Sequence, residues 1–485
     1  MVRFLYALTR ALAHSFAVFI LLLGSTLSGL AVSADKPVGF AEAWQQVISA
    51  NKTLAAAEAG VEQAKNKQDA ARDLYLPEIT ITANYLYLDD EVTLSPTDIL
   101  GSMAAGDQLE AIIAGLARNY GVSADQLTTG LTSTISERSN VTSSIIAKWP
   151  IYTGGRITAA QDIAAAKLGE ASEQLALTQT EQFAKLGRYY FGAVLTRQVL
   201  ATKKDVEAGL KKHRDHAVLL EQQGQIAKVE RMQAEASYDK AIVERKKAES
   251  ELQIAKLALA GMLQSSRPID PADSLFIGAA LPPLAVFLDH TLADYPWLNI
   301  LQAKKKQAAG LVAVEKGRYL PSMGLFGNYN LYEEDELLTK LVPDWIVGVG
   351  ITVPLLERSG RAGNLQAAKS MIRQLDFLQA QARSDLSVLV EKSYQQAGQG
   401  QEEYHGLESS QTLAEQTISL RQKAFAQGLS TSLDVVDAEL FLAGVKTQRA
   451  VAAYNYITAL ITLYSISGEP ENFYLYQQSE GIEVQ

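Results

Sequence analysis

The chain contains no cysteine and only 5 histidines among its 485 residues. Disulfides, thiolate metal sites, thiol catalysis and a lipid anchor on cysteine are therefore excluded. Beyond the N-terminal segment, no stretch reaches the roughly 18 consecutive apolar residues that a membrane-crossing helix needs. We expect the fold itself to hold the protein in place, without cross-links, a lipid anchor or an apolar helix.

The sequence also lacks the signatures of an enzyme, because no Gly-x-Ser-x-Gly, phosphate-binding glycine loop or His-Glu-x-x-His motif occurs. His213 and His216 lie three residues apart among charged residues, and a solvated helix face explains them more simply than a shared metal. The formal net charge of −10 disfavours nucleic acid as a partner. No catalytic residue, metal or cofactor is predicted.

The first 34 residues have the pattern of a cleavable export signal. Arg3 and Arg10 precede an apolar run over 16–23, and small residues follow up to Ala34. We expect the mature chain to start near Asp35, outside the cytoplasm.

An internal duplication organises the rest of the chain. Tyr75-Leu76-Pro77 recurs as Tyr319-Leu320-Pro321, and Gly224 recurs as Gly428 at a smaller offset. The offset falls because the first copy holds an insertion over about 90–138. We interpret 35–264 and 284–468 as two copies of one unit, joined by a Pro- and Asp-rich linker at 265–283 and followed by a C-terminal tail at 469–485.

Long helices dominate each copy. The segments 157–222 and 362–427 are each 66 residues long, lack proline and are rich in helix-forming residues. Each would extend about 100 Å at about 1.5 Å per residue. The shorter helices expected at 40–74 and 230–263 together nearly match one long helix, so we expect them to stack end to end beside it.

Four segments alternate apolar and polar residues, as strands with one apolar face do: 78–85, 141–149, 323–331 and 345–353. Their lengths suit tilted strands that cross a bilayer. Aromatic residues in these strands would form a girdle at the membrane interface: Tyr85, Tyr87, Trp149, Tyr329 and Trp345. The alternative is a small soluble sheet that caps a helical body.

Four strands cannot close a membrane barrel, and lipid does not tolerate an open edge. Two chains would give eight strands with a filled interior, whereas three would give twelve and leave a pore. The insertion, from Asp98 to Thr134, is then an extracellular loop with a helical segment from Leu109 to Tyr120. It would cover the pore, serve as a target for phage or antibodies, or have no active role.

The Pro150–Arg156 stretch, the repeated Tyr-Leu-Pro segments and the stretch from Gly428 to Asp437 make the chain resemble the TolC-type outer-membrane efflux family. The resemblance implies a mainly α fold with a membrane β-barrel, in which a homotrimer forms a twelve-stranded barrel and a periplasmic tunnel of twelve helices. It also implies a periplasmic adaptor and an inner-membrane pump of the RND, ABC or MFS type as partners, besides outer-membrane lipid. Drug efflux, type I protein secretion and heavy-metal export all remain open.

Glycines end both long helices, where a left-handed residue commonly stops a helix. The resemblance implies that these turns dock the adaptor, which assigns Gly224, Gln225, Gly428, Leu429 and Ser430 to docking tips. The same resemblance places Asp434 and Asp437 at a periplasmic aperture, to which we add Glu230. Rings of like carboxylates there would repel one another and select cations.

A simpler interpretation is that these acids favour the dipole of a helix N-terminus, where Thr431 and Asp434 also form a capping-box pattern. The family closes its tip with an Arg and a Tyr, whose positions here hold Ser430 and Phe425. The closed tip is then expected to be held differently, or less tightly. A further alternative for the whole chain is a secreted or periplasmic coiled-coil scaffold without a barrel, which explains the long helices but not the four strands.

Overall fold

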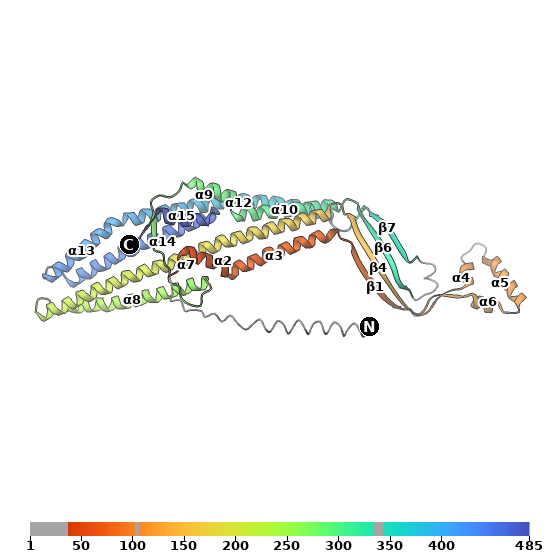
Figure 1. The fold of residues 1–485 in the computed structure, drawn as a ribbon, viewed down its shortest axis with the longest axis horizontal. Helices are drawn as coiled ribbons and strands as arrows, with labels where there is room; N and C mark the ends of the chain where they lie inside the picture. Colours follow the sequence, from red (N-terminus) through yellow and green to blue (C-terminus); the bar gives the residue numbers. More distant parts are fainter. Residues whose placement is uncertain (1–36, 102–105, 334–342, 485) are drawn as a thin grey trace, which may run out of the picture.

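The structure is a computed structural model that describes residues 37–101, 106–333 and 343–484. The predicted export signal lies outside these residues. The molecule is elongated, with a helical body, then a sheet, then a small helical insert at the end away from the two helical tips (Figure 1). No described helix is both long and apolar enough to cross a membrane.

The first long helix forms as predicted: α7 runs unbroken over Arg156–Gln222. The prediction of a single second helix over 362–427 is wrong, because α12 (Arg361–Gly406) ends at Leu407 and α13 (Glu408–Ala426) follows. Gly406 stands directly before this break, and glycine lowers the helix propensity there.

The first short helix is also divided. It consists of α2 (Phe40–Ala50) and α3 (Lys52–Arg72), since the Asn51 side chain accepts hydrogen bonds from the backbone N–H groups of Thr53 and Leu54 and starts a new helix. The expected single helix over 40–74 is therefore corrected. The prediction of a second helix over 230–263 is confirmed by α8 (Lys228–Met262), and α3 and α8 lie along different lengths of α7 (Figure 1).

The second half repeats this order. It contains α9 (Leu284–Asp294), α10 (Pro296–Gly317), then α12 and α13, and finally α14 (Ser432–Ile466). Pro296 begins α10 directly after α9. In the first half Asn51 has the equivalent position, since it caps the start of α3 directly after α2. Each half thus supplies one long column and one column of stacked shorter helices.

The four predicted strands form one antiparallel sheet in the order β1-β4-β6-β7. Their bounds are Glu78–Tyr87, Ser139–Tyr152, Ser322–Glu333 and Trp345–Thr352. Within the described part of the chain, β1 and β7 each pair along one edge only. Both outer edges of the sheet therefore remain open.

One face of this sheet is apolar and exposed. Ile79 and Ile81 on β1 are 65% and 71% exposed, and Val347 on β7 is 69% exposed. The register places these side chains on the same face, which no helix covers. A soluble sheet that caps a helical body would bury this face, so the arrangement argues against that alternative.

The insert between β1 and β4 has its own structure. A two-stranded ribbon, β2 (Val92–Leu94) with β3 (Ser133–Ser136), carries three helices: α4 (Pro96–Gly101), α5 (Gly106–Tyr120) and α6 (Ala124–Leu131). The helix predicted over 109–120 is confirmed as part of α5.

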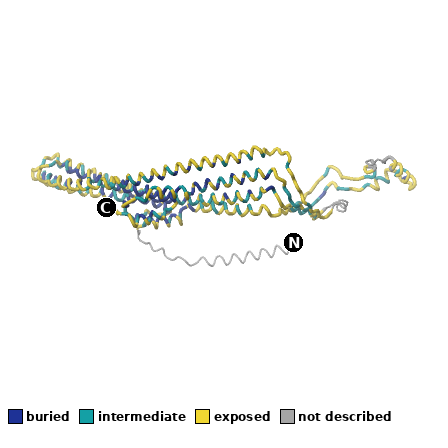
Figure 2. Tube along the Cα trace, turned by 90° about the horizontal axis from the view of Figure 1, so that it is seen from above, coloured by how far each residue is buried: buried dark blue, intermediate teal, exposed yellow. Residues whose placement is uncertain are grey.

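The core lies in the middle of the helical body, where Figure 2 shows the buried residues gathered. It is an aromatic cluster in which Phe40 of α2 contacts the rings of Phe183, Phe191 and Phe473. Phe473 belongs to α15 (Pro470–Glu480), after which β8 (Gly481–Glu483) pairs with β5 (Phe276–Gly278). The segments interpreted as linker and tail thus both contribute elements to this core.

Candidate functional site

Two helical hairpins, α7 with α8 and α13 with α14, end side by side at the end of the body away from the sheet (Figure 1). Gly224 and Gly428 have φ values of 70° and 72°, as predicted for left-handed glycines that stop a helix. In each turn two backbone N–H groups reach back to the last helical carbonyls; Gln225 bonds Leu220 at 2.9 Å and Leu429 bonds Ala424 at 2.9 Å. These hydrogen bonds fix both turns locally.

The residues predicted to dock a partner lie on these turns. Gly224, Gln225, Gly428 and Leu429 are exposed, whereas Ser430 is half-buried. Leu429 is 78% exposed, so it offers an apolar side chain to solvent at the outermost point of its hairpin.

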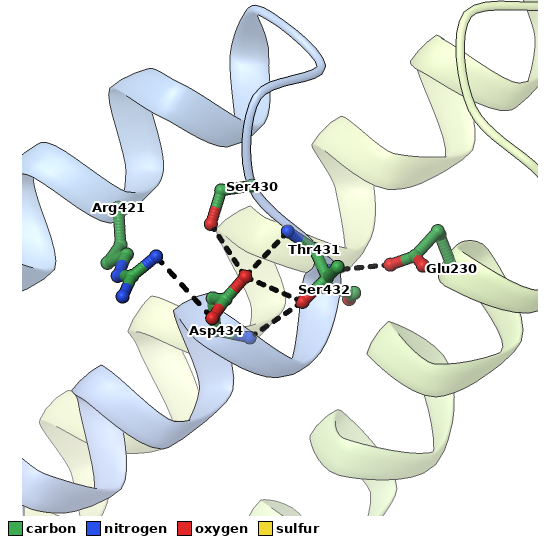
Figure 3. A network of polar contacts seen from close by, with 6 residues as sticks. All are labelled: Glu230, Arg421, Ser430, Thr431, Ser432 and Asp434. Carbon is green, nitrogen blue, oxygen red and sulfur yellow. Dashed lines mark hydrogen bonds and ion pairs between the residues drawn. The ribbon is translucent and has the colours of Figure 1, made fainter.

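Asp434 caps the N-terminus of α14. Its carboxylate accepts hydrogen bonds from the Thr431 backbone N–H at 2.9 Å, the Thr431 hydroxyl at 2.7 Å and the Ser430 hydroxyl at 3.0 Å (Figure 3). The Thr431 hydroxyl oxygen in turn accepts from the Asp434 N–H, which completes the predicted capping box. These bonds lower the pKa of Asp434 to about 2, with a smaller contribution from Arg421 at 3.4 Å. The carboxylate is therefore ionised at neutral pH and engaged within its own hairpin.

Ser432 joins the two hairpins. Its backbone N–H donates to the Glu230 carboxylate of α8 at 2.6 Å (Figure 3), and its hydroxyl lies 2.6 Å from Nε2 of His213 on α7. We call this group of three residues, His213, Ser432 and Glu230, the hairpin clasp. It connects α7 and α8 to the first turn of α14.

His213 corrects the sequence-based interpretation of a solvated helix face, because its side chain is buried. The Phe425 ring packs against it with centroids 4.5 Å apart. Burial lowers the pKa of His213 to about 4, and the neighbouring His216 adds to this shift. The signal was present in the sequence: Leu210, His213, Ala217 and Leu220 follow the helical spacing of a buried stripe, and all are buried.

Asp437 differs from the other two acids predicted to line the aperture. Glu230 and Asp434 make hydrogen bonds within the subunit, on either side of the first turn of α14. Asp437 is exposed, one turn further along α14, beside a groove formed with α7 and α8. It is therefore the most exposed of the three predicted aperture acids.

The predicted girdle residues share the apolar face of the sheet. Their exposed fractions range from 45% for Trp149 to 68% for Tyr87. Trp149 lies at the end of the sheet near the helices, where its indole N–H donates to the Tyr75 carbonyl at 2.8 Å. Tyr85 pairs with Val141, so about 27 Å of β4 separates Trp149 from the level of Tyr85 at about 3.4 Å per residue. Tyr329, which pairs with Trp345, lies opposite Ile145, midway between these levels. The spacing from Trp149 to the level of Tyr85 matches the apolar band of about 25 Å in membrane barrels.

Comparison with known proteins gives the family. A family model described as "Outer membrane efflux protein" matches residues 43–264 and 288–469. The chain belongs to this family. The resemblance inferred from the sequence is confirmed, and membership in a family of outer-membrane channels excludes an enzyme and places the protein in the outer membrane.

Two relatives illustrate the sequence similarity. The alkaline protease secretion protein AprF of Pseudomonas aeruginosa is 26% identical over 248 residues, which are 50% of this chain and 49% of AprF. The outer membrane protein TolC of Vibrio cholerae is 24% identical over 205 residues, 40% of this chain and 46% of TolC. The chain spans about half the length of the curated relatives it matches.

The fold agrees with solved channels over a larger part of the chain. The outer membrane protein VceC of Vibrio cholerae superposes with a TM-score of 0.70, covering 89% of this chain and 96% of VceC at 14% identity. The predicted fold class, long helical hairpins continuous with a membrane sheet, is confirmed.

We predict that the hairpin clasp weakens on acidification. Because burial holds the pKa of His213 near 4, against 6.5 for a free imidazole, the unfolded segment binds more protons between these pH values. The contribution of neutral His213 to the free energy of unfolding is complete above pH 6.5. It falls by up to about 3 kcal/mol as the pH drops toward 4. Hydrogen exchange at the Ser432 amide, corrected for the intrinsic rate, should accelerate over this window.

His213→Gln should remove this pH dependence, because the amide keeps a polar group near Ser432 but does not titrate. The matched control is His405→Gln on α12, since His405 is exposed and should leave the wild-type dependence unchanged. A wild-type protein whose Ser432 protection is constant from pH 7 to pH 4.5 would contradict the clasp.

Proposed function

We propose that this protein is the exit duct of an export system, which passively conducts substrates from a periplasmic adaptor and an inner-membrane pump to the exterior. The observation that carries the proposal is a membrane-length sheet with two open edges, continuous with helices that extend about 100 Å. Membership in the outer membrane efflux protein family supports it.

The duct is a homotrimer. Four strands per chain leave two open edges, and three chains close them into a barrel of twelve strands wide enough for a pore. Each chain also contributes four helical columns: α7, α12 with α13, α3 with α8, and α10 with α14. Three chains then surround one tunnel with twelve columns, which follows the cyclic symmetry of most homo-oligomers.

Asp437 lines the periplasmic aperture, and Asp434 and Glu230 hold its shape. Asp437 is exposed, so three-fold symmetry makes it the source of a carboxylate ring. Asp434 stabilises the turn of its own hairpin, while Glu230 binds Ser432 across the two hairpins. The hairpin clasp takes the place of the Arg and Tyr link typical of the family, whose positions hold Ser430 and Phe425.

The exposed turns, Gly224 with Gln225 and Gly428 with Leu429 and Ser430, receive the adaptor. Protein secretion is the substrate class favoured by the similarity to AprF, whose name describes alkaline protease secretion. Drug efflux and heavy-metal export use the same duct architecture and are the alternatives; a pump of the RND, ABC or MFS type supplies the energy.

Replacing Asp437 should reduce the cation selectivity of the channel. Asp437→Asn removes one negative charge per chain at the aperture, so the ratio of potassium to chloride permeability in planar bilayers should fall several-fold. The matched control is Glu42→Gln on α2, which removes an exposed charge far from the tip. Unchanged selectivity in Asp437→Asn would show that this acid does not line the conducting path.

Replacing Leu429 should impair export without affecting assembly. Leu429→Ser removes the exposed apolar side chain of the second turn, so adaptor-dependent export should fall while the amount of trimer in the outer membrane stays the same. Gln427→Ser alters an exposed neighbour and serves as the control. Normal export by Leu429→Ser would argue against docking at this turn.

A further inference from the structure

The insert carries an interaction surface that the duct function does not use. We call α4, α5 and α6, on their β2–β3 ribbon, the head. We propose that the heads of the three copies converge on the three-fold axis and pack against one another through α5, forming a collar at the outer mouth of the duct. This inference rests on the proposed trimer.

The head is held in a fixed relation to the sheet. The β1–β4 ladder runs without a break from Glu78 opposite Lys148 to Tyr87 opposite Ser139. Beyond it, the Leu88 N–H donates to the Arg138 carbonyl at 2.7 Å, and the Arg138 guanidinium donates to the Asp89 carbonyl at 2.7 Å. Hydrogen bonds thus continue from the sheet toward the ribbon, and Figure 1 shows the head beyond the end of the sheet.

This position places the head at a boundary between copies. The head extends from the β1–β4 hairpin, and β1 is an open edge strand of the sheet. In a closed barrel a strand of the next copy pairs with β1, because membrane strands cannot keep unpaired backbone groups. Each head therefore stands next to a neighbouring subunit of the ring.

The α5 helix has an uncovered apolar stripe. Ile112, Leu116 and Tyr120 recur at every fourth residue, so they lie on one side of the helix, and they are 56%, 45% and 77% exposed. Ala117, about 100° further around α5 than Leu116, is buried. A water-exposed helix normally turns its apolar face inward and a polar face to solvent, so the exposed part of this apolar face requires a partner.

The charge of the insert favours another copy of this chain over a lipid surface as that partner. Residues 89–138 contain eight acidic and two basic side chains. Helices that lie on membranes carry Lys and Arg on their polar face and are attracted by anionic lipids, whereas this insert would be repelled. The like charges also oppose contact between heads, and salt weakens this repulsion because the Debye length falls from about 10 Å at 0.1 M to about 3 Å at 1 M.

The absence of cysteine from the chain allows a direct test. Leu116→Cys in the full-length protein, oxidised in intact outer membranes, should give covalent dimers whose yield rises with ionic strength. Arg118→Cys is the matched control, because this exposed position lies on the opposite side of α5 and should give few dimers. Adding Ile112→Asp to Leu116→Cys should lower the yield, since it places a charge within the stripe.

The trimer is assayed separately, by native electrophoresis of the same samples. An intact trimer with no dimer, or with equal yields at positions 116 and 118, would overturn the collar and leave the duct untouched. The loss of the trimer in the wild-type protein would instead contradict the proposed function. A position-116 thiol that resists maleimide labelling yet forms no dimers would mean that a lipid or another macromolecule covers the stripe, which also overturns the collar.

Discussion

The structure depends on one constraint: a sheet in lipid cannot leave its edges unpaired. Each missing backbone hydrogen bond in a bilayer costs several kcal/mol, and the outer edges of β1 and β7 are open among the residues that the structure describes. One side of the sheet exposes apolar and aromatic side chains over a length that suits a bilayer, as a surface facing lipid does. The sheet therefore has no stable form in a membrane except as part of a ring of several chains.

The helical body continues this ring away from the membrane, and its ends are held by short-range polar contacts. The largest apolar cluster lies in the middle of the body, where the Phe40 and Phe473 rings contact each other. The tips have smaller apolar clusters and rely on hydrogen bonds at Ser432 and Asp434. The tips are therefore held by fewer apolar contacts than the middle of the body.

Much of this arrangement follows from local sequence signals. Alternation of apolar and polar residues predicted all four strands to within a few residues, because one face is apolar and the other is largely polar. The left-handed glycines at 224 and 428 were also predictable, since they stand where the helical pattern stops. The Thr431 and Asp434 capping box depends on a spacing of three residues and was visible in the sequence.

Features that depend on distant contacts were not predictable in the same way. The helix breaks at Asn51 and Leu407 leave composition almost unchanged, and only the cap at Asn51 marks the first. The role of α15 depends on contacts between Phe473 and residues hundreds of positions earlier. The burial of His213 was missed because charged neighbours hid its place on the buried stripe of α7.

The most direct test of the account joins the open edges of the sheet. Cysteines are introduced in pairs, one on β1 and one on β7, at a series of positions along the two strands. Within one chain the two cysteines lie on opposite edges of the sheet, so they can meet only across a subunit boundary of the ring. Oxidation in the outer membrane should give a covalent ladder of two and three chains that stops at three. A ladder that stops at two, or that continues beyond three, would contradict the twelve-stranded barrel on which the proposed duct depends.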